Sequence, residues 1–94
     1  MATLEPLYDK PYVIVYGRDT CGWTTKYFND LRDRGLDVFY ENVDHPGVGD
    51  ELHPRMKKAG LDTWRYYLPV IDVNAKMYIR PDYETIFTEY ENVD

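Results

Sequence analysis

The hydrophobic positions along the chain fall into short continuous runs and into spaced patterns, which predict strands and helices respectively. Runs rich in β-branched and aromatic residues at 12–16, 38–43 and 70–73 predict strands. The first run is almost entirely apolar, which is typical of a strand buried on both faces of a sheet. A further strand is expected at 76–79, because Asn74-Ala75 between two such runs indicates a tight hairpin.

The segment Gly22–Arg34 has the periodicity of an amphipathic helix. Its apolar and small residues share one side, while charged residues occupy the other, and the shared side is formed by Thr24, Tyr27, Phe28 and Leu31. Gly35 follows at the place where a left-handed residue commonly ends a helix. A helix joining the strands at 12–16 and 38–43 predicts a right-handed parallel unit.

Two further helices are expected later in the chain. One is assigned to 50–59 with Gly60 as its end, and a start at His53 is the alternative, because Pro54 fits best in a first helical turn. The other follows Asp82, a good N-cap, and carries apolar residues at i, i+3, i+4 and i+7, namely Tyr83, Ile86, Phe87 and Tyr90.

The resulting order, β-α-β-α-β-β-α, predicts an α/β fold. A four-stranded mixed sheet with helices on both faces would cover all of the apolar faces together. The length of 94 residues indicates one folded domain at 12–94, preceded by an N-terminal arm at 1–11.

Composition excludes several classes of function. The net charge of −6 argues against nucleic acid as a partner, because phosphate binding requires surplus cationic charge. No apolar run reaches the roughly 18 residues of a membrane span, and 1–10 has no signal-peptide pattern. His45 and His53 lack the neighbouring ligands of a zinc site, so no metal site is expected. A single cysteine cannot form an internal disulfide, which favours a reducing, cytoplasmic location.

That cysteine, Cys21, follows the first strand and a short polar loop, and it immediately precedes the first helix. Unpaired N–H groups and the helix dipole stabilise an anion at this place, so its pKa can fall from about 8.5 to about 3.5–7.5. We therefore predict a reactive thiolate, the alternative being an inert buried cysteine. The hydroxyl of Thr24 could donate to this thiolate, or Thr24 could simply pack on the helix.

Two motifs and the element order carry a resemblance to a known family. Cys21-Gly22-Trp23-Thr24 lies at the strand-to-helix junction, and Leu68-Pro69-Val70 precedes the third strand. Over residues 12–90 the chain resembles the glutaredoxin branch of the thioredoxin fold. Thr24 stands where the resolving cysteine would be, so the chain is similar to a monothiol member. The resemblance implies a cis Pro69 facing Cys21, with the backbone of Leu68 pairing with an extended, peptide-like ligand.

The resemblance also implies further substrate-binding residues. Arg18 corresponds to a family lysine near the glycine carboxylate of glutathione, and Arg65 is a second candidate for a substrate carboxylate. Trp23 and Tyr67 would flank the thiol as walls of a groove, unless they belong to the core. Asp82, besides capping its helix, could meet the ammonium group of glutathione.

The chain departs from the family pattern at one segment, and two aromatic residues of another segment are expected to be buried. Residues 80–84, Arg-Pro-Asp-Tyr-Glu, stand where the family has a Gly-Gly-x-Asp segment for the γ-glutamyl end of glutathione. On the loop that carries Tyr67, Trp64 and Tyr66 are expected in the core.

The expected function is that of a monothiol glutaredoxin-like thiol–disulfide oxidoreductase with glutathione as co-substrate. Cys21 would attack a mixed disulfide, carry the glutathione and be freed by a second small thiol. Its partners would be small thiols and disulfide-bearing or glutathionylated proteins, with the chain a monomer or a dimer linked through Cys21. The alternatives are a [2Fe–2S] cluster shared by two subunits through Cys21, and a glutaredoxin-fold binding module without catalysis.

Overall fold

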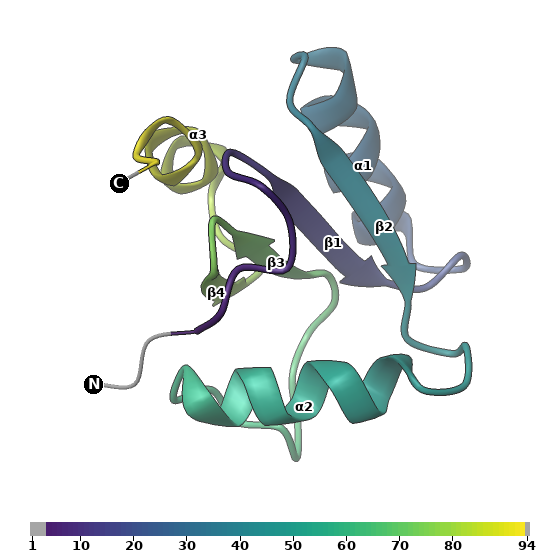
Figure 1. Cartoon of the computed structure of the whole chain (residues 1–94). Coiled ribbons are helices and arrows are strands. Elements are labelled where there is room, and N and C mark those ends of the chain that lie inside the picture. Colours follow the sequence, from purple (N-terminus) through teal and green to yellow (C-terminus); the bar gives the residue numbers. More distant parts are fainter. Residues whose placement is uncertain (1–3, 94) are drawn as a thin grey trace.

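The computed structural model describes residues 4–93, which form one four-stranded sheet and three helices (Figure 1). The strand order is β2-β1-β3-β4; β1 and β2 run parallel, and the other neighbouring pairs are antiparallel. The elements are β1 (Val13–Gly17), α1 (Gly22–Asp33), β2 (Val38–Asn42), α2 (Val48–Lys58), β3 (Val70–Val73), β4 (Lys76–Ile79) and α3 (Tyr83–Glu91). The predicted α/β class and element order are confirmed.

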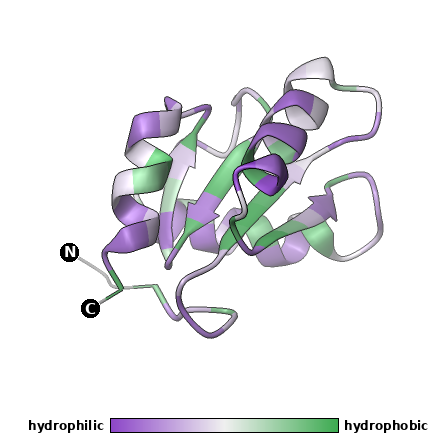
Figure 2. Cartoon of the chain, turned by 90° about the horizontal axis from the view of Figure 1, so that it is seen from above, coloured by the Kyte–Doolittle hydropathy of each residue, from purple (hydrophilic) through white to green (hydrophobic). Residues whose placement is uncertain are grey.

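The two faces of the sheet are covered by different helices. Successive side chains of a strand point to opposite faces. Ile14 therefore packs with Leu52 and Met56 of α2, while Val13 and Val15 pack with residues of α1 and α3. Figure 1 shows α2 on one side of the sheet and the other two helices on the opposite side. In Figure 2 the hydrophobic segments lie along the central strands between these layers.

Helix α2 begins earlier than the sequence pattern predicted. It starts at Val48, after Gly47 as a left-handed N-cap with φ 87°, and the alternative start at His53 is wrong. Pro54 lies inside the helix, where it removes one backbone hydrogen bond to the carbonyl of Asp50. Both residues are on the exposed side, so water can reach that carbonyl, whereas Leu52 and Met56 face the core.

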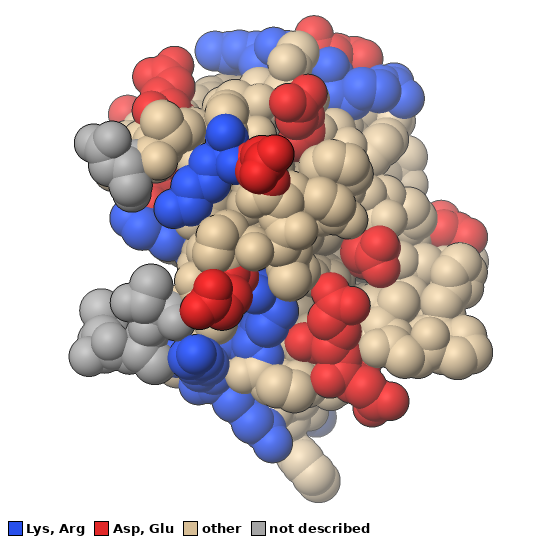
Figure 3. Space-filling model, in the orientation of Figure 1, with Lys and Arg blue, Asp and Glu red and all other residues tan. Residues whose placement is uncertain are grey.

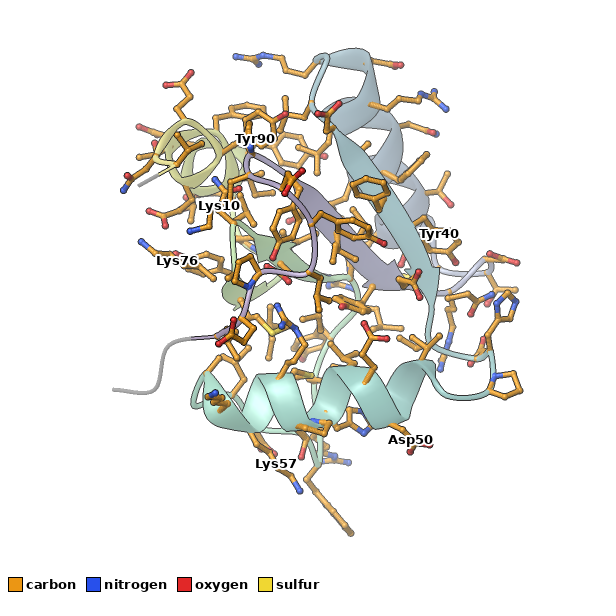
Figure 4. All side chains as sticks on the ribbon, viewed as in Figure 1. Lys10, Tyr40, Asp50, Lys57, Lys76 and Tyr90 are labelled. Atoms are coloured by element: carbon orange, nitrogen blue, oxygen red, sulfur yellow. The ribbon has the colours of Figure 1, made fainter. Side chains whose placement is uncertain are left out.

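The charges of α2 follow the direction of the helix. Its first turn carries Asp50 and Glu51, and its last turn carries basic residues, an arrangement that complements the helix dipole. In Figure 3 acidic side chains accordingly gather toward one end of this helix and basic ones toward the other. Figure 4 shows Asp50 and Lys57 pointing away from the sheet.

The described part of the N-terminal arm, residues 4–11, packs on the same face as α2. Leu4 is buried in the core cluster that contains Leu52 and Met56. The ring of Tyr8 stacks on that of Phe39 in β2, with centroids 4.1 Å apart. Residues 1–3 of the expected arm, and residue 94 of the expected domain, lie outside the described residues.

A buried ion pair joins α2 to the middle of the sheet. Arg55 contacts the carboxylate of Asp72 in β3, whose side chain is fully buried. The Tyr12 hydroxyl donates to the same carboxylate at 3.2 Å, and the Ala75 N–H donates to it at 2.9 Å. Burial raises the pKa of Asp72, and Arg55 with these donors opposes that rise. Arg55 also donates to the Glu5 carbonyl at 2.7 Å, so this network fixes the arm as well.

Replacing Arg55 with methionine should destabilise the protein by about 3–5 kcal/mol, because the buried Asp72 carboxylate would lose its cation. The free energy of unfolding in urea measures the effect. Lys57→Met, an exposed position on the same helix, is the control and should change it little. Equal unfolding midpoints for the two variants would show that the pair does not support the fold.

Candidate thiol site around Cys21

The pairing of β1 with β3 brings the predicted motifs together. Tyr16 near the end of β1 is paired with Val70 at the start of β3. The residues that follow β1 and those that precede β3 therefore meet at one end of the sheet. Cys21 is the N-cap residue of α1, and its Sγ lies 4.0 Å from the carbonyl oxygen of Leu68. The Leu68–Pro69 peptide bond is cis, as predicted.

The Cys21 thiol has a lowered pKa. Burial of the partly exposed sulfur is the largest influence and acts against ionisation, but several donors together outweigh it. These are the hydroxyl and backbone N–H of Thr24, the backbone N–H of Trp23, and the positive charge of Arg80. The downward shift of the pKa is the one that the position of Cys21 at the helix N-terminus predicted. A lower pKa favours the thiolate, which is the nucleophilic form of cysteine.

Thr24 is held beside the sulfur by close packing. Its side chain is buried, and its hydroxyl makes no hydrogen bond to another group within residues 4–93. A Cβ at Gly17 would lie 2.1 Å from the Thr24 Oγ1, so glycine at the end of β1 provides the space for this side chain. A buried hydroxyl without another partner gains a hydrogen bond when the sulfur becomes an anion.

Arg80 is the functional candidate that the sequence interpretation missed. Its Nε donates to the Leu68 carbonyl at 2.7 Å, the oxygen that also faces the Cys21 sulfur. Its guanidinium carbon lies 4.9 Å from the ring centroid of Trp23 and 5.1 Å from that of Tyr67. The φ of Arg80 is 46°, a left-handed conformation that turns the chain after β4. In the sequence, the only signal at Arg80 is the absence of the glycine pair that the glutaredoxin family has there.

The two arginines predicted to bind substrate are both exposed. Arg18 is exposed and paired with Asp44 at 3.1 Å, and the cation that lowers the pKa of Cys21 is Arg80 instead. Arg65 is exposed and lines an open groove of about 560 Å³ with Tyr66, Tyr67 and Ile79.

Asp82 has the capping role that its position predicted. It is the N-cap of α3 and accepts a hydrogen bond from the Thr85 N–H at 2.9 Å. Hydrogen bonds from the Thr85 side chain and backbone lower the pKa of Asp82.

The aromatic residues of the loop before β3 are divided between surface and core. Tyr67 is 71% exposed and Trp23 is 50% exposed, which fits side chains that flank the thiol and not core aromatics. Tyr66 is partly buried and its hydroxyl lies 2.7 Å from the Nε2 of His53. Trp64 is 89% exposed, so its predicted place in the core is wrong. Its segment is an irregular loop, where helical or strand periodicity cannot indicate burial.

The donor set of the chain does not by itself fit an iron–sulfur cluster. A [2Fe–2S] cluster takes four thiolate ligands or close equivalents, and the sequence supplies one cysteine. Within residues 4–93 no group of three or more His, Cys, Asp or Glu side chains is placed to hold a metal ion.

Comparison of the chain with protein-family models, with curated proteins and with solved structures found no match. Among the helices of residues 4–93, none has the length and apolar character needed to cross a membrane.

Alkylation of Cys21 at increasing pH should give an apparent pKa below the ordinary value of about 8.5. Thr24→Val removes a donor to the thiolate, so it should raise this pKa, whereas Thr24→Ser keeps the hydroxyl and should leave it close to that of the wild type. Iodoacetamide reaction rates between pH 4 and 10 provide the measurement. Identical profiles for the valine and serine variants would rule out a role for the hydroxyl.

Proposed function

We propose that the chain is a monothiol glutaredoxin-like thiol–disulfide oxidoreductase with a thioredoxin-like fold. The observation that carries the proposal is the lowered pKa of a partly exposed thiol at the start of α1, facing the Leu68 carbonyl. The strand order and the position of Leu68-Pro69 ahead of β3, beside Cys21, support the assignment of the fold. The lone cysteine favours a reducing, cytoplasmic setting and a one-cysteine mechanism.

The reaction consists of two thiol–disulfide exchanges. The Cys21 thiolate attacks the sulfur of the small thiol in a mixed disulfide, so that a new S–S bond forms and the target protein leaves as a thiolate. A second small thiolate then attacks the same sulfur. This step produces a small-molecule disulfide and returns Cys21 to its anionic form. Glutathione is the first candidate for the small thiol, and no general base is required when Cys21 is already ionised.

The groups around the sulfur serve both exchanges. Donors that lower the pKa of Cys21 increase the fraction of thiolate for the first attack. They also make Cys21 a better leaving group in the second exchange, since thiols of lower pKa leave faster. Thr24 and the first-turn N–H groups therefore assist catalysis without transferring a proton.

The exposed surface beside the sulfur suits an extended substrate. Trp23 and Tyr67 both contact the guanidinium of Arg80 and are exposed. The Leu68 carbonyl lies between the sulfur and Arg80, where a substrate backbone could pair with this segment.

Incubation with glutathione disulfide should add one glutathione to the wild-type chain and none to Cys21→Ser, as read by mass spectrometry of the intact protein. In a coupled assay with a glutathionylated peptide and excess reduced glutathione, Cys21→Ser should fall to the uncatalysed rate. If the wild type takes up the adduct but is no faster than Cys21→Ser, the chain is a binding module and not an enzyme.

A further inference from the structure

The guanidinium of Arg80 is fixed in place beside the thiol. Its Nε donates to the Leu68 carbonyl, and its guanidinium carbon lies 4.9 Å and 5.1 Å from the ring centroids of Trp23 and Tyr67. Among residues 4–93 its two Nη groups have no hydrogen-bond or ion-pair partner. A guanidinium held at one nitrogen and against two aromatic rings has lost much of its rotamer freedom, so the remaining N–H groups are preorganised for an anion.

The anion that such a fork binds best is a carboxylate, which can accept two parallel N–H bonds. The Cys21 Sγ lies 4.0 Å from the Leu68 oxygen, and the Arg80 Nε lies 2.7 Å from the same atom. Because both groups contact the same oxygen, a carboxylate bound by Arg80 would lie close to the sulfur that Cys21 attacks. A substrate that uses both groups therefore needs its carboxylate near its sulfur.

The segment that follows Arg80 in the chain provides no cation for a second carboxylate, and Arg65 lies farther along the groove that Tyr67 and Ile79 line. Pro81 has no backbone N–H, and its carbonyl accepts a hydrogen bond from the Tyr27 hydroxyl at 2.7 Å. Asp82, next in the chain, is negatively charged and caps α3. The cation nearest in sequence to Cys21, Arg18, is already paired with Asp44.

Resting on the function proposed above, we infer that Arg80 selects small thiols that carry a free carboxylate close to the sulfur, as in cysteine. In cysteine two carbons separate the sulfur from the carboxylate. In glutathione that carboxyl group is part of a peptide bond, and the free carboxylates lie at the two ends of the molecule. The preferred substrates are accordingly S-cysteinylated proteins.

With cysteine as the small thiol, the reaction consists of two thiol–disulfide exchanges. The Cys21 thiolate attacks the cysteine sulfur of an S-cysteinylated protein, and the protein leaves as a thiolate. Cys21 then carries cysteine through a disulfide, with the cysteine carboxylate on Arg80. A second cysteine thiolate attacks the sulfur of the bound cysteine, cystine is released and the Cys21 thiolate is restored.

The test compares one peptide whose thiol is blocked by cysteine, by cysteamine or by glutathione. Cysteamine is cysteine without the carboxylate, and the leaving peptide is the same in each case. The wild type should show a kcat/KM for the cysteine adduct that is about 10- to 100-fold above that for the cysteamine adduct, the worth of a charge-assisted pair. Its kcat/KM for the glutathione adduct should lie below that for the cysteine adduct.

Arg80→Gln should reduce the cysteine-to-cysteamine ratio to near one, and Arg80→Lys should restore part of it. Arg32→Gln, an exposed arginine of α1, is the matched control and should keep the wild-type ratio. The two kcat/KM values are compared within each variant, so a change in the pKa of Cys21 or in the folded fraction affects both values equally and cancels from their ratio.

Three results would overturn the inference: a wild-type cysteine-to-cysteamine ratio near one, a ratio that Arg80→Gln leaves unchanged, or faster turnover of the glutathione adduct than of the cysteine adduct. In each case, turnover that depends on Cys21 would leave the proposed function intact. If the wild type turns over no adduct faster than Cys21→Ser, the proposed function itself fails.

Discussion

The candidate site depends on the antiparallel pairing of β1 with β3. The register that places Tyr16 opposite Val70 fixes where the chain leaves β1 and where it enters β3. Cys21 and Leu68, 47 positions apart in the sequence, therefore meet at one end of the sheet. Arg80 joins them because β4 pairs with β3 and ends beside the start of that strand, with Ile79 opposite Val70. A shift of one residue in either pairing would turn the strand's side chains to the other face and separate these groups.

The pKa of Cys21 is lowered in spite of the overall charge of the chain. The chain has a net charge of −6, and a further anion is disfavoured on a surface of that sign. The surface charges act through water and salt, which screen them over about 8–10 Å. The N–H groups of Trp23 and Thr24 and the Thr24 hydroxyl act at short range, where screening is weak. Local donors therefore lower the pKa of the sulfur against the effect of the net charge.

The features that could be predicted from the sequence are those that hydrophobic periodicity and local backbone chemistry determine. The strands, the buried face of α1 and the N-cap role of Asp82 follow from local patterns, and the placement of Cys21 follows from a strand, a turn and a helix in succession. The early start of α2 was missed because the left-handed Gly47 allows Val48 to join the helix and pack on the core. The exposure of Trp64 was missed because an irregular loop has no period from which to infer burial.

Arg80 could not be predicted for a different reason. Its place in the site depends on a left-handed backbone at φ 46°, which arginine adopts rarely and which no neighbouring residue indicates. That conformation turns the side chain toward Leu68, and the contact exists only once β3 and β4 have paired.

The position of Arg80 also gives a physical reason for two exposed aromatic rings. A patch of large exposed aromatic side chains often marks a site that binds an apolar surface of another molecule. The guanidinium of Arg80 contacts both Trp23 and Tyr67, and these cation–π contacts are favourable although both rings remain exposed. Each ring also limits the rotamers of the arginine, which keeps its positive charge near the sulfur. The rings thus help to hold this charge in place while they remain exposed.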